Sequence, residues 1–199
     1  MRSRQREATA AAILDAAEEE LAKRGLNTAT MNDIAAAAGV AVGTLYNHFK
    51  DRDALLAALL QERRAGLIAV MEEFLEQPSS GDFATDLRAL VNLMGGYFEK
   101  NRRFHMILHQ LEFGLNTAAY PETAACTPKM KAEMHLRLDK LIKRGVKMKA
   151  LRPELAEYYP TLLLGMMRSM RFRLVELGRS DERLPLDEVV HFFMHGAAA

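Results

Sequence analysis

The sequence predicts an all-α protein, and three observations support this fold class. Helix-breaking residues are sparse, because the 199 residues include only 12 Gly and 6 Pro. Alanine, leucine, glutamate, arginine and methionine recur along the chain at helical spacing. Cys126 is the single cysteine, which excludes an intramolecular disulfide and a thiolate metal cluster and leaves an apolar core to hold the fold. With 49% hydrophobic and 27% charged residues, the composition is that of a globular protein.

The N-terminal part of the sequence predicts four helices. The first is expected over about residues 4–24, because its apolar residues share one stripe and Gly25 is suited to end it. Three more are expected over residues 31–38, 42–49 and about 52–75, each set apart by a helix breaker or a capping residue. The apolar stripe of the first helix consists of Ala10, Ile13, Leu14, Ala17 and Leu21.

The clearest break in the chain is the Gln-Pro-Ser-Ser-Gly sequence at residues 77–81. Beyond it, apolar residues at helical spacing predict core helices over about 83–98 and 104–111. Residues 116–125 are expected to form a loop.

Three helices are expected in the remaining part. Thr127 and Pro128 are typical of an N-cap and the first helical position, so one helix is expected to start there and to reach about 146–149. The next, over about 153–177, is apolar almost all round and must be covered on both sides. A short last helix is expected over 185–196. Because two-fold pairing is the commonest way to cover a second apolar face, we expect the last two helices of each subunit to form the four-helix bundle of a homodimer.

The chain is expected to comprise a small head at residues 1–51 and a larger helical domain at residues 52–199, with about nine helices in all. No apolar stretch is long enough for a signal peptide or a membrane span, so we expect a cytoplasmic protein that does not contact the membrane. The net charge of +1 does not by itself indicate a nucleic-acid partner. Residues 1–65 hold nine basic and nine acidic residues, so any attraction to DNA must come from their distribution. The basic residues Arg2, Arg4 and Arg6 are expected to form a solvated, disordered terminus, with a groove-reading arm as the alternative.

Residues 30–49 have the pattern of two short helices joined by a tight turn. Thr30 and Asp33 have the spacing of a capping box, and Gly39 is suited to end the first helix. A helix fits the major groove of DNA, and hydroxyl, amide and imidazole groups can bind phosphates and base edges. The apolar contacts that lock the pair are expected from Ile34, Val40, Leu45 and Phe49, and the outer face of the second helix from Val42, Gly43, Thr44, Tyr46, Asn47 and His48.

Within this segment, Thr-Met-x-x-Ile-Ala-x-x-Ala-Gly-Val-x-x-Gly-Thr-Leu-Tyr-x-His-Phe closely resembles the signature of TetR-type (tetracycline-repressor-like) transcriptional regulators. The resemblance in sequence detail covers about the first quarter of the chain. It implies a helix-turn-helix head joined to a larger helical domain that binds a small effector and dimerises. It also implies a homodimer, more often a repressor than an activator, that binds a palindromic DNA operator and releases it when the effector binds.

The resemblance also implies roles for individual residues. Thr44 resembles the family's recognition-helix threonine, and Tyr46 and His48 resemble its phosphate-contacting tyrosine and histidine. The family's phosphate-binding lysine near the start of the fourth helix is replaced here by Arg52, with Lys50 two residues earlier, and either residue could make that contact. The full set of expected DNA-binding residues is Thr30, Val42, Gly43, Thr44, Tyr46, Asn47, His48, Lys50 and Arg52.

Ala41 departs from the family's pattern. A serine or a similar capping residue is common at this position, so the second helix of the pair is expected to lack a side-chain N-cap. A loss of about 1 kcal/mol is typical of such a change.

Methionines are abundant in the larger domain, where they either fill the core or line an adaptable pocket for a hydrophobic or aromatic effector. On the second interpretation, the candidate effector residues are Met94, Tyr97, His105, Met106, His109, Met134, Met166 and Met170. No cofactor and no metal is expected.

Two other classes of function are alternatives to the DNA-binding regulator. The zero net charge of residues 1–65 motivates a helical small-molecule-binding protein without DNA affinity. An enzyme is less favoured, because no set of nucleophile, base and orienting residue is visible; its most plausible form is a metal hydrolase that uses His105 and His109.

Overall fold

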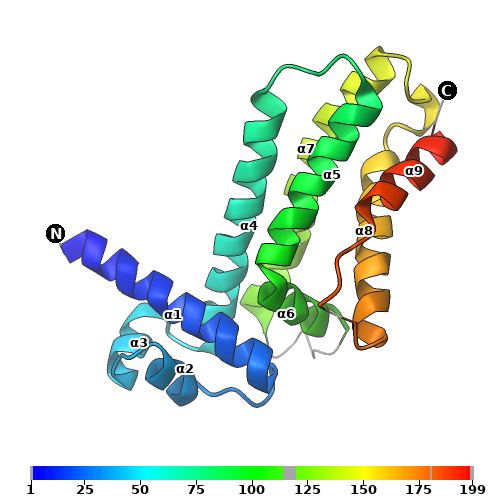
Figure 1. Cartoon of the computed structure of the whole chain (residues 1–199). Helices are drawn as coiled ribbons and strands as arrows, with labels where there is room; N and C mark the ends of the chain where they lie inside the picture. Colours follow the sequence, from blue (N-terminus) through cyan, green and yellow to red (C-terminus); the bar gives the residue numbers. More distant parts are fainter. Residues whose placement is uncertain (1, 114–119, 180, 198–199) are drawn as a thin grey trace. The chain divides into compact units, whose positions relative to one another are not determined.

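The computed structural model describes residues 2–113, 120–179 and 181–197, with the side chains of Arg2, His109, Glu112, Phe113, Thr127 and Ala197 left outside the description. These residues form nine α-helices, one short 3₁₀ helix and no strand, so the predicted all-α fold is confirmed (Figure 1). The α-helices are α1 (Arg2–Arg24), α2 (Met31–Ala37), α3 (Val42–His48), α4 (Arg52–Glu76), α5 (Phe83–Lys100), α6 (Arg102–Phe113), α7 (Pro121–Lys147), α8 (Tyr159–Glu176) and α9 (Leu186–Ala197).

The start of α7 differs from the prediction. The helix begins at Pro121, so residues 121–125 are helical rather than part of a loop, and Pro128 lies inside the helix instead of opening it. The rest of the predicted loop, residues 116–119, lies outside the described residues. Pro121 suits a first turn, where a missing N–H costs nothing. The neighbouring amides are bonded by a side chain from α4, which sequence spacing could not reveal.

The predicted helix over 153–177 is also corrected. A separate 3₁₀ helix, η2 (Pro153–Leu155), precedes α8, which begins at Tyr159 with Pro160 in its first turn. Proline removes a backbone donor and fixes φ, so Pro160 would interrupt a helix that began at Pro153 but fits one that begins beside it.

The first residues of α1 are helical, so the expectation of a disordered basic arm is wrong. Arg4 and Arg6 lie in α1 and are exposed. Alanine, glutamine, glutamate and arginine dominate this stretch, and all of them favour the helix, which explains why it continues to the N-terminal end.

The chain divides into two compact units. The first contains residues up to Arg64 together with Asn101–Lys129, and the second contains Ala65–Lys100 together with the residues from Met130 onward. This grouping follows packing rather than chain order, and the expected functional boundary after residue 51 stays a prediction.

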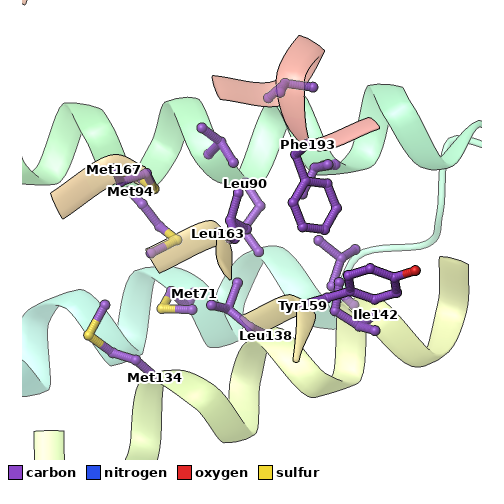
Figure 2. Close-up of a cluster of buried hydrophobic side chains, with 14 of the residues drawn as sticks. Met71, Leu90, Met94, Met134, Leu138, Ile142, Tyr159, Leu163, Met167 and Phe193 are labelled. Carbon is purple, nitrogen blue, oxygen red and sulfur yellow. The ribbon is translucent and has the colours of Figure 1, made fainter. Parts of the chain in front are cut away.

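The second unit is built around one buried apolar cluster to which α4, α5, α7, α8 and α9 contribute. Figure 2 shows Met71, Met94, Met134 and Met167 towards one end of the view, and the rings of Tyr159 and Phe193 towards the other. These two rings meet edge to face with their centroids 5.5 Å apart. Flexible thioethers therefore fill one part of this core, and rigid aromatic rings fill the other.

Close packing of helices in this unit depends on glycine. A Cβ atom at Gly145 of α7 would lie 2.6 Å from the nearest ring carbon of the buried Phe83. Among the described helices, none is both long enough and apolar enough to cross a membrane.

Candidate nucleic-acid interface

The first three helices form a small head whose core is fully buried. Ile13 and Leu21 of α1, Ile34 of α2 and Leu45 of α3 have no exposed surface. Phe49, directly after α3, is buried as well, whereas Val40 in the turn is only half-buried. The predicted contacts that dock the helix pair on the first helix are therefore present, and they hold α3 from its inner side (Figure 1).

Helix α2 has the predicted capping box. The Thr30 hydroxyl accepts a hydrogen bond from the Asp33 amide at 3.2 Å, and the Asp33 carboxylate accepts one from the Thr30 amide at 2.9 Å. The Thr30 hydroxyl and amide hold the pKa of the Asp33 carboxyl below its ordinary value. Two backbone amides at the helix start are thereby satisfied by local side chains.

The turn between α2 and α3 depends on Gly39. Its φ of +67° lies in the left-handed region, where glycine meets no steric penalty. The Gly39 amide bonds to the Ala36 carbonyl and the Val40 amide to the Ala35 carbonyl, which is the Schellman pattern. This arrangement ends α2 and turns the chain towards α3, as the sequence predicts.

Helix α3 places its polar residues outward. Gly43, Tyr46 and Asn47 are exposed, with Tyr46 at 49%, while Thr44 and His48 are half-buried. Val42 in the first turn is also exposed. Six of the nine residues predicted to bind DNA thus lie on the accessible side of one short helix, and Gly43 near its start leaves room for a nucleic-acid backbone.

The two candidate phosphate-binding cations differ in accessibility. The Lys50 side chain is 66% exposed and follows α3 by two residues. Arg52 is half-buried, and its Nε and Nη2 atoms are enclosed without a hydrogen-bond partner among the described residues. Lys50 is therefore the cation that this arrangement offers to a phosphate group.

Several acidic residues of α1 are paired with arginines. Arg63 of α4 contacts the carboxylates of Asp15 and Glu18, each at 2.7 Å. Burial alone would lower the pKa of the Arg63 guanidinium, but the hydrogen bonds to these carboxylates outweigh it and raise that pKa. Arg24 pairs with Glu20 at 2.6 Å. The head's acidic charge is thus largely used in ion pairs, which the zero sum of charges did not indicate.

In the first turns of two later helices, backbone amides donate hydrogen bonds to carboxylates of earlier helices in the same unit. Glu18 accepts a hydrogen bond from the Phe104 amide in the first turn of α6, at 3.2 Å. Asp53 of α4 accepts hydrogen bonds from the amides of Glu122 and Thr123 in the first turn of α7, at 2.7 and 2.9 Å. Sequence analysis missed these contacts. Asp53 lies early in α4, where an acidic residue is expected to interact with the start of its own helix. Nothing in its spacing indicates a contact with residues about seventy positions away.

Comparison with known proteins agrees with this geometry. The sequence profile described as "Bacterial regulatory proteins, tetR family" matches residues 13–59. The fatty acid metabolism regulator protein of Bacillus subtilis is 37% identical over 68 residues, which are 34% of this chain and 35% of that protein. The HTH-type transcriptional repressor Rv1474c of Mycobacterium tuberculosis is 36% identical over 80 residues, which are 36% of this chain and 43% of that repressor. Residues 13–59 of the chain thus carry the sequence pattern of the TetR family.

The similarity extends to the whole TetR-family fold. The solved structure of the regulator FadR from Bacillus subtilis in complex with stearoyl-CoA matches with a TM-score of 0.79 and 21% identity, covering 93% of this chain and 97% of that one. At this identity the match shows a shared fold. The matched segment spans less than half the length of these two curated relatives, 35% and 43% respectively.

The candidate effector residues fall into two groups. In the second unit, Met94 and Met134 are buried in the apolar cluster, and Tyr97, Met166 and Met170 pack against it while partly buried. His105 and Met106 lie on α6 in the first unit, both half-buried. The side chain of His109 lies outside the described residues. Five of the eight residues are thus associated with one cluster.

The described side chains supply no third ligand for a metal site at His105 and His109. Among these, no three His, Cys, Asp or Glu residues lie close enough together to hold a metal ion. The side chain of His109 lies outside the described residues, so a metal site that includes it stays a hypothesis.

The capping of the two head helices yields a stability prediction. Thr30→Ala removes the N-cap of α2 and should lower the free energy of unfolding by about 1 kcal/mol. Ala41→Ser should raise it by a similar or smaller amount, because α3 begins at an extended Ala41 with no side-chain cap. Urea unfolding followed by circular dichroism measures both changes.

The control for this prediction is Thr28→Ala, which alters an exposed threonine in the preceding loop. An equal loss of stability in the Thr28 and Thr30 variants would contradict the capping argument.

Proposed function

We propose that the chain is a one-component transcriptional repressor. It acts in the cytoplasm, binds a palindromic DNA operator as a homodimer, and releases the operator when a small hydrophobic effector binds. The observation that carries the proposal is helix α3: its Leu45 is buried against the head, while Tyr46 and Asn47 are exposed on its outer surface. A helix held in this way suits the major groove, with hydroxyl and amide groups directed at phosphates and base edges.

Apolar side chains on α8 and α9 support the homodimer. Leu162 of α8 is 52% exposed and Phe192 of α9 is 61% exposed, although both helices belong to the unit with the buried cluster. Gly165 and Ser169 lie on α8 at helical spacing from Leu162 and are exposed, so a second helix could approach closely. A second copy of the chain would cover these side chains by two-fold pairing.

The methionine-rich part of the cluster supports a hydrophobic effector. Methionine has three rotatable bonds and a polarisable sulfur, so a core that contains Met71, Met94, Met134 and Met167 can repack around a guest more readily than one of branched residues. Long acyl chains have the flexible, apolar shape that such a site accommodates. The similarity to a fatty acid metabolism regulator and to FadR with stearoyl-CoA supports the same class of ligand.

Selection of duplexes from a random library, at low and moderate salt, tests DNA binding. We expect an enriched palindrome whose half-sites are separated by roughly 34 to 36 Å, one turn of B-DNA, or somewhat more. Tyr46→Phe should weaken binding to every duplex by a similar factor, about threefold to tenfold, because it removes a phosphate contact. Asn47→Ala should instead change which sequence is preferred.

Enrichment of no duplex at either salt would contradict this proposal. It would favour the second class of function, a helical small-molecule-binding protein without DNA affinity.

Leu162→Glu tests the homodimer. A charge in the proposed interface should shift the protein to a monomer, measured by analytical ultracentrifugation, and should weaken binding to the selected duplex by about tenfold or more because the half-sites are no longer engaged together. Leu136→Glu is the matched control, since Leu136 of α7 is 55% exposed. A Leu162 variant that stays dimeric would exclude this surface.

Stearoyl-CoA serves as the probe for the effector class. It should weaken binding to the selected duplex by about fivefold to 150-fold, while coenzyme A alone should have no effect. Each methylene removed from the acyl chain should cost about 0.8 kcal/mol of effector affinity, or roughly fourfold, until the chain is too short to bind. Equal effects of stearoyl-CoA and coenzyme A would exclude an acyl-binding site.

A further inference from the structure

The first turn of α7 is fixed to the first turn of α4. The Asp53 carboxylate accepts hydrogen bonds from the Glu122 amide at 2.7 Å, the Thr123 amide at 2.9 Å and the Thr123 hydroxyl at 2.6 Å. Thr123 is buried. Burial would raise the pKa of the Asp53 carboxyl, but these hydrogen bonds outweigh it and the pKa lies below its ordinary value. A carboxylate at a helix start satisfies amides that have no partner within the helix.

This fixed turn directs the Glu122 side chain to Lys50. The Lys50 Nζ and the Glu122 Oε1 are 2.5 Å apart, and the side chains are 66% and 45% exposed. The hydrogen bond and the charge of Glu122 raise the pKa of the Lys50 ammonium. The cation beside the recognition helix is therefore held by a carboxylate oxygen, which offers an ammonium the same charge and bonding as a phosphate oxygen.

We propose that Glu122 competes with DNA phosphate for Lys50 and thereby sets the protein's DNA affinity. The inference rests on the proposed DNA-binding function. To contact a phosphate, Lys50 must leave Glu122, and the released carboxylate then stands as a negative charge beside the DNA. The amide bonds to Asp53 keep this carboxylate close by, because they fix the turn that carries it.

The competition gives α7 a role in regulation. Its first turn belongs to the unit that contains the recognition helix, and the same continuous helix carries Met134 and Leu138 of the buried cluster in the second unit. A change that shifts the first turn of α7 alters the availability of Lys50. By linkage, DNA bound to Lys50 must favour the arrangement in which Glu122 is released.

Glu122→Gln tests the inference, with binding to the selected duplex measured over a series of salt concentrations. Glutamine keeps the backbone amide that Asp53 holds and removes only the charge. We expect affinity at low salt to rise by about twofold to fivefold, as for the loss of an exposed ion pair. The slope of the logarithm of affinity against the logarithm of salt concentration should steepen by up to about 0.9, because one more net positive charge faces the phosphates.

Three further variants complete the experiment. Lys50→Gln, made alone and together with Glu122→Gln, should abolish most of the gain, because the gain acts through Lys50. Glu122→Asp keeps the charge and should retain most of the wild-type salt slope. Glu73→Gln removes the same charge from an exposed position of the second unit and should leave both affinity and slope unchanged.

The outcomes separate this inference from the function on which it rests. Duplex binding with the same affinity and slope in the wild type and in Glu122→Gln would overturn the competition while leaving the repressor proposal intact. A gain that persists in full without Lys50 would overturn it as well. If no variant binds any duplex, the proposed function fails and the inference fails with it.

Discussion

The structure of the first unit depends on carboxylates that satisfy the starts of helices far away in the sequence. An α-helix leaves its first amides without partners, and in a packed unit those amides must find acceptors. Glu18 of α1 supplies one for α6, and Asp53 of α4 supplies two for α7. Each carboxylate comes from an element that belongs to the head or adjoins it. The starts of these later helices are therefore held by carboxylates of α1 and α4.

Under the proposed function, the same pairings help residues 1–65, which have no net charge, to approach DNA. Acidic residues of α1 are held by Arg63 and Arg24, so their charge is opposed locally rather than spread over the surface. Glu18 and Glu20 are themselves buried, so these pairs place an arginine charge directly against carboxylates that have little contact with solvent. The pair between Lys50 and Glu122 differs, because its cation follows α3 closely and, under the proposed function, has an alternative partner in a phosphate group.

Much of the head could be predicted because its determinants are local. The capping box of Thr30 and Asp33 and the turn at the left-handed Gly39 each depend on residues at most five positions apart, and both are present as expected. The absence of a cap at Ala41 was equally visible in the sequence. Periodicity also identified the outer face of α3, since a helix with one apolar side must expose the other.

The starts of α7 and α8 could not be predicted with the same success. Thr127 and Pro128 have the local chemistry of a helix start, but Pro121 is chosen instead, because Asp53 satisfies the amides that follow it. Between the two prolines that could open α8, the sequence favoured Pro153 and the structure uses Pro160. Helix starts are predicted correctly where the capping group lies nearby in the sequence, and wrongly where the capping group belongs to another helix.

By itself, the sequence determined the helical fold class, the helix-turn-helix segment with its caps, and the residues on the outer surface of α3. These features follow from spacing within a few turns, which the order of residues specifies directly. Only the tertiary structure decided which acids pair with which arginines, that Lys50 rather than Arg52 is accessible, and that Glu122 holds Lys50. Such contacts join residues up to about ninety positions apart, and their formation depends on how whole helices pack rather than on any pattern along the chain.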